Sequence, residues 1–212
     1  MRSLFIVLAL VCLVSVSGCT GSNAAPPAEI DAKVKAFLNQ EQGRWRDMNV
    51  PYQDGQVLYD LIVKNNYRNV LEIGTSTGLS GVWIAWALSK TGGKLTTIEI
   101  DERRHGIAVA NFKKTGLAPY VSAVRGDAHK LVYELKGPYD LVFTDADKSW
   151  YIKYFDALHP KLEQGGTFAA HNVLNTGMSG IPEFVEYVKG REDYVTTIDR
   201  SSRAGISLSR KQ

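Results

Sequence analysis

The chain has 212 residues, of which 44% are hydrophobic, and a formal net charge of +3. This length suits one globular domain, and the hydrophobic fraction is ordinary for a folded core. No run of Lys or Arg follows one face of a predicted element, so we expect no nucleic-acid partner.

Residues 1–19 have the features of a secretory signal peptide. Arg2 precedes an apolar stretch, residues 4–16, that is too short to span a bilayer. The following small residues and Cys19 resemble a bacterial lipobox, in which the cysteine would receive a diacylglycerol. The alternative is a plain cleaved signal with an incidental cysteine. We therefore expect a location in the bacterial cell envelope, either lipid-anchored through Cys19 or periplasmic or otherwise exported.

Residues 20–28 are small, polar and proline-containing, which is typical of a flexible tether. The folded domain is then predicted to cover residues 29–212. Its only contact with a membrane would be the lipid on Cys19. The chain has two cysteines, Cys12 and Cys19, so the domain has no disulfide and depends on its core for stability.

Apolar residues recur at helical spacing in residues 29–42 and 54–66, which predicts two N-terminal helices. Strands and helices alternate after them. The pattern predicts a doubly wound, Rossmann-like α/β sheet that is mostly parallel. Two β-rich runs close the chain with no helix between them. They predict an antiparallel hairpin and bring the sheet to seven strands. The strands are expected at 69–73, 94–100, 121–125, 139–145, 166–171, 194–198 and 205–209, and the helices at 79–90, 102–115, 128–135, 149–163 and 181–190.

A glycine turn follows the first predicted strand. Glu72, Gly74 and Gly78 have the spacing Glu-x-Gly-x-x-x-Gly, and the next strand ends at Glu99. The glycines let the backbone approach a ligand, and the Glu99 carboxylate can accept two hydrogen bonds from a ribose diol. A phosphate-binding loop would need Gly-Lys-Ser/Thr, and a dinucleotide site a different glycine spacing. The alternative is an ordinary strand–turn–helix whose glycines serve packing.

Polar side chains also end the fourth and fifth predicted strands. Asp145 and Lys148 follow one strand, and His171 and Asn172 follow the other. Ligands of such sheets bind at the carboxyl ends of the strands, where these side chains should converge. Asp and Asn oxygens suit Mg²⁺, Ca²⁺ or Mn²⁺. The alternatives are a helix cap at Asp145 and a polar loop at residues 171–172. Because these side chains are expected together at adjacent strand ends beside the glycine turn, a functional site is favoured over these alternatives.

Several segments resemble the cation-dependent O-methyltransferases, the family that contains catechol and caffeoyl-CoA O-methyltransferases. The similarity runs from about Trp45 to the end of the chain. Its most specific part is Asp145-Ala-Asp-Lys148, which is similar to the segment that holds a metal-binding Asp and the catalytic Lys. Residues 48–50 and 54–56 resemble the segment that closes over S-adenosylmethionine (SAM), 70–80 the first SAM motif, 97–100 the ribose motif, and 205–208 the closing strand.

This resemblance implies a SAM-dependent O-methyltransferase with a Rossmann-like fold. The reaction would move a methyl group to a hydroxyl of a small, aromatic or catechol-like acceptor, with help from a divalent cation, Mg²⁺ or Mn²⁺. Lys148 and His171 are the expected catalytic residues, and a homodimer is a further candidate because the family often dimerises. The strand ends and the motifs together predict the cofactor-binding residues Met48, Val50, Glu72, Gly74, Thr75, Ser76, Gly78, Ser80, Glu99, Ile100, Asp127, Ala128 and Asp145.

One residue departs from the family pattern. Where the family has Asp-Asn after the fifth strand, this chain has His171-Asn172. If Asp145, His171 and Asn172 bind a metal, imidazole shifts the preference from Mg²⁺ towards Mn²⁺, Fe²⁺, Co²⁺ or Zn²⁺. If the metal is lost, His171 can serve as general base. Both readings stay open at this point.

The predicted export conflicts with the supply of SAM, which is made in the cytoplasm. A second hypothesis is therefore an envelope lipoprotein that has this fold and binds a nucleoside or small metabolite without catalysis. The presence of Asp145 and Lys148 argues against it. Trp45, Trp150 and Tyr151 are candidates for the wall of an aromatic acceptor pocket.

Overall fold

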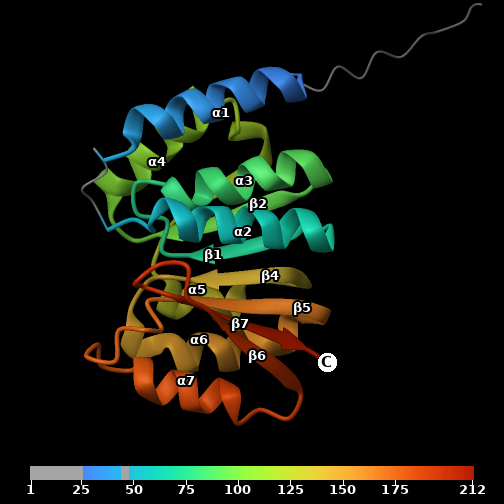
Figure 1. Ribbon diagram of the computed structural model, residues 1–212, viewed down its shortest axis with the longest axis vertical. Coiled ribbons are helices and arrows are strands. Elements are labelled where there is room, and N and C mark those ends of the chain that lie inside the picture. The colour runs from blue at the N-terminus through green and yellow to red at the C-terminus, as the bar shows by residue number, and fades with distance from the viewer. Residues whose placement is uncertain (1–25, 44–47) are drawn as a thin grey trace, which may run out of the picture.

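Seven strands form one sheet in the order β3-β2-β1-β4-β5-β7-β6 (Figure 1). The computed structural model describes residues 26–43 and 48–212. Neighbouring strands among β1 to β5 pair in parallel, whereas β7 pairs antiparallel with both β5 and β6. The predicted fold class is therefore confirmed. The strands are β1 Asn69–Ile73, β2 Lys94–Glu99, β3 Val121–Arg125, β4 Tyr139–Thr144, β5 Leu162–His171, β6 Tyr194–Asp199 and β7 Ile206–Lys211.

Helices cover both faces of this sheet. None of the described helices has the length and the apolar character needed to cross a membrane. Residues 1–25, with the predicted signal peptide, lipobox and most of the tether, lie outside the described residues, as does Trp45. The helices are α1 Pro27–Glu41, α2 Tyr52–Asn65, α3 Leu79–Thr91, α4 Glu102–Lys114, α5 Ala128–Glu134, α6 Tyr151–Leu158 and α7 Ile181–Lys189, with short 3₁₀ turns η1 Ala118–Tyr120, η2 Lys148–Trp150 and η3 His159–Lys161.

Several boundaries differ from the prediction. Helix α1 starts at Pro27, inside the expected tether, because proline is well suited to the first helical turn. The predicted helix 149–163 is shorter, since α6 ends at Leu158 and Pro160 lacks the N–H that a continuing α-helix needs. The chain then enters β5 at Leu162, four residues earlier than expected.

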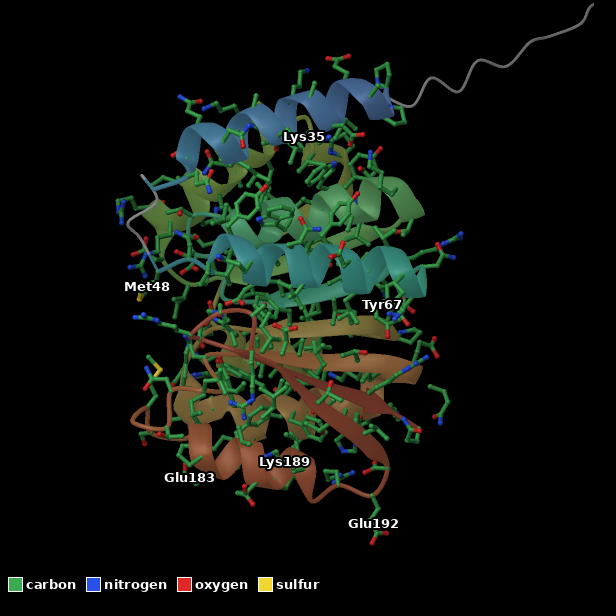
Figure 2. All side chains as sticks on the ribbon, viewed as in Figure 1. Lys35, Met48, Tyr67, Glu183, Lys189 and Glu192 are labelled. Atoms are coloured by element: carbon green, nitrogen blue, oxygen red, sulfur yellow. The ribbon has the colours of Figure 1, made fainter. Side chains whose placement is uncertain are left out.

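Alternate strand residues point into two separate cores. Val70 and Leu141 pack with α1 to α4, whereas Leu71 and Val142 pack with α5 to α7 on the other face. The carboxyl ends of β1 to β5 meet at one edge, where no helix covers them. Met48 lies at this edge, and Tyr67, just before β1, lies at the opposite one (Figure 2).

Backbone contacts hold the strand-end loops together at that edge. Gly74 donates its N–H to the Ile98 carbonyl at 3.0 Å, and Asp145 donates to the Ile73 carbonyl at 2.9 Å. Gly74 has a φ of +94°, and a Cβ there would lie 3.0 Å from the Ala146 nitrogen. Only glycine allows the loops after β1 and β4 to approach this closely.

Candidate active site

A cavity of about 760 Å³ opens at the carboxyl ends of the parallel strands. This volume lies within the usual range for cofactor and small-molecule sites. Most of the residues predicted for the site form its wall. These are Met48, Gly74, Ser76, Glu99, Ile100, Asp127, Ala128, Asp145, Lys148, His171 and Asn172.

The loop after β1 and the end of β2 form one side of the cavity. Ser76 donates its backbone N–H to Glu99 Oε2 at 2.7 Å, and Asp101 donates to Oε1 at 2.9 Å. Each carboxylate oxygen is thereby oriented and keeps a further lone pair. Ser76 adopts a left-handed conformation, with φ +49°, which aims its N–H at the carboxylate. The arrangement can receive the two hydroxyls of a ribose.

Five residues predicted to bind the cofactor lie behind this wall instead. The side chains of four of them are buried within the fold, and Gly78 lets the loop approach Ala108 of α4 closely. Thr97 Oγ1 bridges Thr75 Oγ1 and Glu72 Oε2, both at 2.5 Å. The five are Val50, Glu72, Thr75, Gly78 and Ser80.

Glu72 is fully buried beneath the loop. Burial raises its pKa to about 7, although hydrogen bonds from Ser80 and Thr97 oppose the shift, and Asp145 and Glu99 add to it. Burial disfavours a carboxylate because the charge loses its hydration. Glu72 therefore acts as a partly protonated support of the loop.

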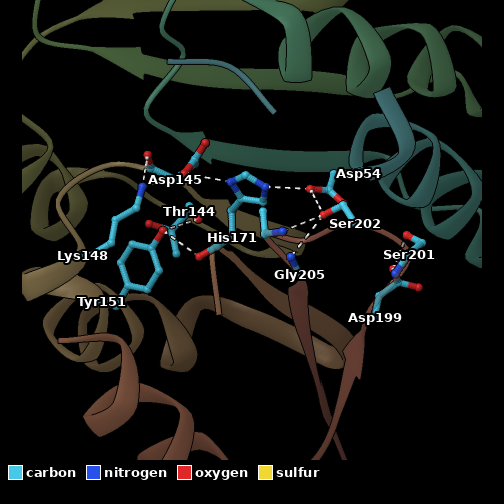
Figure 3. A network of polar contacts seen from close by, with 11 residues as sticks. Asp54, Thr144, Asp145, Lys148, Tyr151, His171, Asp199, Ser201, Ser202 and Gly205 are labelled. Atoms are coloured by element: carbon cyan, nitrogen blue, oxygen red, sulfur yellow. Dashed lines mark hydrogen bonds and ion pairs between the residues drawn. The ribbon is translucent and has the colours of Figure 1, made fainter. Parts of the chain in front are cut away.

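Asp145, Lys148 and His171 line the other side of the cavity and form a network with the buried Asp54 behind them (Figure 3). Lys148 Nζ lies 2.6 Å from Asp145 Oδ1, and His171 Nδ1 lies 3.2 Å from the same oxygen. His171 Nε2 lies 2.8 Å from Asp54 Oδ2. The imidazole ring thus stands between two carboxylates, and Figure 3 shows Asp145 and Asp54 on opposite sides of it.

The charges in this network control one another. Burial alone would lower the pKa of His171, but its contacts with Asp145 and Asp54 outweigh burial and raise the pKa to about 9. Burial would raise the pKa of Asp145, but His171 and Lys148 lower it below its ordinary value. His171 is consequently an imidazolium at neutral pH, and Asp145 is a carboxylate.

Asp54 was not among the predicted site residues. It lies in the first turn of α2 and is fully buried, and its Oδ2 also accepts a hydrogen bond from Ser202 Oγ at 2.8 Å. The sequence contained a signal for it: Asp54 precedes the buried Leu58 and Ile62 by four and eight positions. An acid on the apolar stripe of a helix requires a buried partner. That partner, His171, is 117 positions away.

Two of the three predicted metal ligands, Asp145 and His171, contact one another in the structure. The described residues contain no group of three or more His, Cys, Asp and Glu side chains arranged around a metal position. His171 Nε2 is hydrogen-bonded to Asp54, and Nδ1 lies 3.2 Å from Asp145 Oδ1. The raised pKa of His171 disfavours the role of general base at neutral pH, because an imidazolium already carries the proton that a base would accept.

The aromatic wall also differs from expectation. Tyr151 is buried, and its hydroxyl donates to the Thr144 carbonyl at 3.1 Å. Trp150 stacks on His129 with ring centroids 3.7 Å apart, and His129 rather than Trp150 faces the cavity. Tyr154, one helical turn further along, is the aromatic side chain in the wall. The structure extends the predicted set with Asn49, Ile98, Arg104, Gly126, His129, Ala146, Asp147, Tyr154 and Met178.

Comparisons with known proteins agree with this geometry. The chain is 33% identical over 153 residues to a catechol O-methyltransferase of Niastella koreensis, covering 70% of this chain and 69% of that protein. It is 30% identical over 169 residues to a caffeoyl-CoA O-methyltransferase of Petunia hybrida, covering 76% and 69%. An O-methyltransferase of Streptomyces achromogenes, solved in complex with SAM, superposes with a TM-score of 0.71 at 25% identity, covering 90% and 92%.

The family model for O-methyltransferases matches residues 24–193. This match extends through α1 to α7 and through β1 to β5, and so includes every strand end that lines the cavity. Taken with the curated relatives, it shows that this chain belongs to the O-methyltransferase family and is a SAM-dependent enzyme.

Proposed function

We propose that the protein transfers the methyl group of SAM to one hydroxyl of a small, aromatic, catechol-like acceptor. The observation that carries this proposal is a single cavity that joins Glu99 on one side to Lys148 on the other. A ribose held at Glu99 would direct the sulfonium methyl towards the ends of β4 and β5. The relatives named for catechol and caffeoyl-CoA support an aromatic acceptor.

The reaction forms an oxygen–carbon bond and breaks the sulfur–carbon bond of the sulfonium. The acceptor hydroxyl loses its proton to solvent, and the Lys148 ammonium, which donates to the Asp145 carboxylate and backbone carbonyl at 2.6 and 2.9 Å, stabilises the oxyanion that forms. The products are a methyl ether and S-adenosylhomocysteine. Holding two substrates in line in one cavity supplies much of the rate.

The walls suit a flat, partly apolar acceptor. Tyr154 and His129 supply rings, and the side chains of Met48 and Met178 supply adaptable apolar surface. No step of this mechanism requires a divalent cation, and two of the predicted ligands, Asp145 and His171, contact one another.

Calorimetric titration with SAM, followed by mass spectrometry of reactions with catechol and with phenol, tests the proposal. We expect micromolar binding of SAM and a product heavier by one methyl group. Failure to bind SAM contradicts the proposal. Binding of SAM without methylation of any hydroxyl acceptor would instead favour the hypothesis of a binding protein without catalysis.

A second proposal concerns the location of the protein. The support is the sequence of residues 1–19, in which an apolar stretch and small residues lead to Cys19. We infer that Cys19 is lipidated and that the domain acts in the bacterial cell envelope. Labelling of bacteria with a clickable palmitate analogue should mark the full chain but not Cys19→Ala. Equal labelling, or none in either protein, contradicts lipidation.

A further inference from the structure

The family resemblance predicts a divalent cation at this site. The contacts of His171 indicate a different arrangement of charge. The geometry points to an active site in which the charged His171 side chain, held between Asp54 and Asp145, takes the place of that cation. The enzyme then methylates an acceptor that presents one hydroxyl and needs no metal. The part about the acceptor rests on the proposed function, whereas the part about the metal does not.

The positive charge of His171 lies between two buried carboxylates. The ends of α2, β4 and β5 bring Asp54, Asp145 and His171 to the same place. The His171 side chain is 4% exposed, and the side chains of Asp54 and Asp145 are 0% and 12% exposed. Carboxylates that are this deeply buried require a positive partner. In this site the partner is built into the chain.

The positive and negative charges of this network balance one another. Asp54 and Asp145 contribute two negative charges, and His171 and Lys148 contribute two positive charges within 3.2 Å of them. A divalent cation would add two positive charges to a set that is already neutral. One oxygen of each carboxylate, Asp54 Oδ2 and Asp145 Oδ1, is already engaged by His171, Lys148 or Ser202.

Having His171 in place of a metal ion changes which acceptors the site can use. A metal ion can bind two adjacent oxygens of a catechol at once and so favours acceptors with two neighbouring hydroxyls. A single imidazolium cannot do this, because it has no coordination positions for two oxygens, and its Nε2 is already bonded to Asp54 while Nδ1 lies 3.2 Å from Asp145. The acceptor hydroxyl therefore meets Lys148 alone, and a second hydroxyl is not required.

Titration calorimetry with Mn²⁺ tests the metal part without any acceptor. The wild-type protein should bind no Mn²⁺ at micromolar concentrations. His171→Asp should gain Mn²⁺ binding by at least about tenfold, because it removes one positive and adds one negative charge. His171→Asn is the matched control and should gain nothing. Micromolar binding by the wild type, or a folded His171→Asp protein that gains none, overturns the inference.

NMR of the wild-type protein keeps the inference testable if His171→Asp does not fold. The ring nitrogens of ¹⁵N-labelled His171 should both show the shifts of protonated imidazolium at pH 7. A neutral ring, with one unprotonated nitrogen, overturns the inference.

Activity separates this inference from the proposed function. Turnover should be unchanged when EDTA is added, and kcat/KM for a phenol should lie within about tenfold of that for the matching catechol. Loss of turnover in EDTA, or methylation of catechols alone, contradicts the inference. If no acceptor is methylated, the proposed function fails, whereas the Mn²⁺ and NMR results still decide the role of His171.

Discussion

The two sides of the cavity are built in different ways. The cofactor side consists of one loop and the ends of two neighbouring strands, and backbone N–H groups orient Glu99. The acceptor side consists of charged side chains from distant parts of the chain, with Asp54 117 positions from His171. A short sequence segment specifies the first side, and only the complete tertiary fold specifies the second. The two sides should therefore respond differently to substitution.

The largest expected effect is on the acceptor side. Lys148→Met should lower kcat by roughly 100- to 1,000-fold, because the positive charge that stabilises the developing oxyanion is lost. Affinity for SAM should change by less than about threefold, since Lys148 lies away from the ribose position. Lys153→Met is the control, because Lys153 stands over the Trp150 ring, 4.3 Å from its centroid, and does not line the cavity. Equal activity of the two variants would remove Lys148 from the mechanism.

Removal of Asp54 tests whether the distant network also stabilises the fold. Asp54→Ala should lower the free energy of unfolding by about 3 kcal/mol, because one partner of a buried ion pair is lost. Urea denaturation measures the change. Asp60→Ala removes an exposed acid that accepts a hydrogen bond from Gln56 at 2.9 Å, and it should cost less than about 0.5 kcal/mol. Similar costs for the two variants would contradict a structural role for the network.

The pH dependence of the same pair sharpens the test. Contacts with Asp54 and Asp145 raise the pKa of His171 from 6.5 to about 9, against the opposing effect of burial. Its stabilising contribution is therefore complete below pH 6.5 and is lost as the pH rises through 9. The difference in unfolding free energy between wild type and Asp54→Ala should shrink between pH 7 and pH 10. A constant difference would mean that His171 is not charged.

Glu99→Gln probes the cofactor side. The amide should bind a ribose diol less well, and the Kd for SAM should rise roughly tenfold, in line with a hydrogen bond to a charged group. Glu102→Gln is matched in chemistry and changes an exposed acid 2.9 Å from Arg125. Calorimetry should find its Kd for SAM unchanged. If both variants bind SAM like the wild type, the ribose does not bind at Glu99.

The smallest expected effect comes from Glu72 beneath the loop. Burial raises its pKa from 4.5 to about 7, so the folded state holds a proton that the unfolded state has lost between these values. The wild type therefore loses stability as the pH rises from 4.5 to 7. Glu72→Gln should gain about 1 kcal/mol at pH 7.5 and less at pH 5, as measured by urea denaturation. A loss at both pH values would show that the carboxylate is required.

The same contrast explains what the sequence could predict. The order of strands and helices is encoded locally and is confirmed, and Gly74 of the glycine turn and Glu99 line the cavity. The buried position of Glu72 was not anticipated, although the pattern contained a hint. Leu71 and Ile73 point to the α5–α7 core, so Glu72 must point to the other face, under α3. The motif identified the loop but not which side chains reach the cavity.

The surroundings of His171 could not be predicted for a different physical reason. The sequence shows which residue types meet at the strand ends, but not which charges balance them. Asp54 belongs to a helix that precedes the sheet, and nothing local indicates that it reaches the end of β5. When the contact with Asp54 is not known, the sequence indicates that His171 is a metal ligand or a general base. With Asp54, it is the centre of an ion-pair network.

The contact between Asp54 and Ser202 also has a consequence for synthesis. The two residues are 148 positions apart, and Ser202 lies between β6 and β7. A chain that leaves the ribosome N-terminus first makes this contact only when its last strands have emerged. The cofactor side is translated by about residue 128, long before this point. The residues of the nucleoside site are therefore all translated well before the last residue of the acceptor-side network.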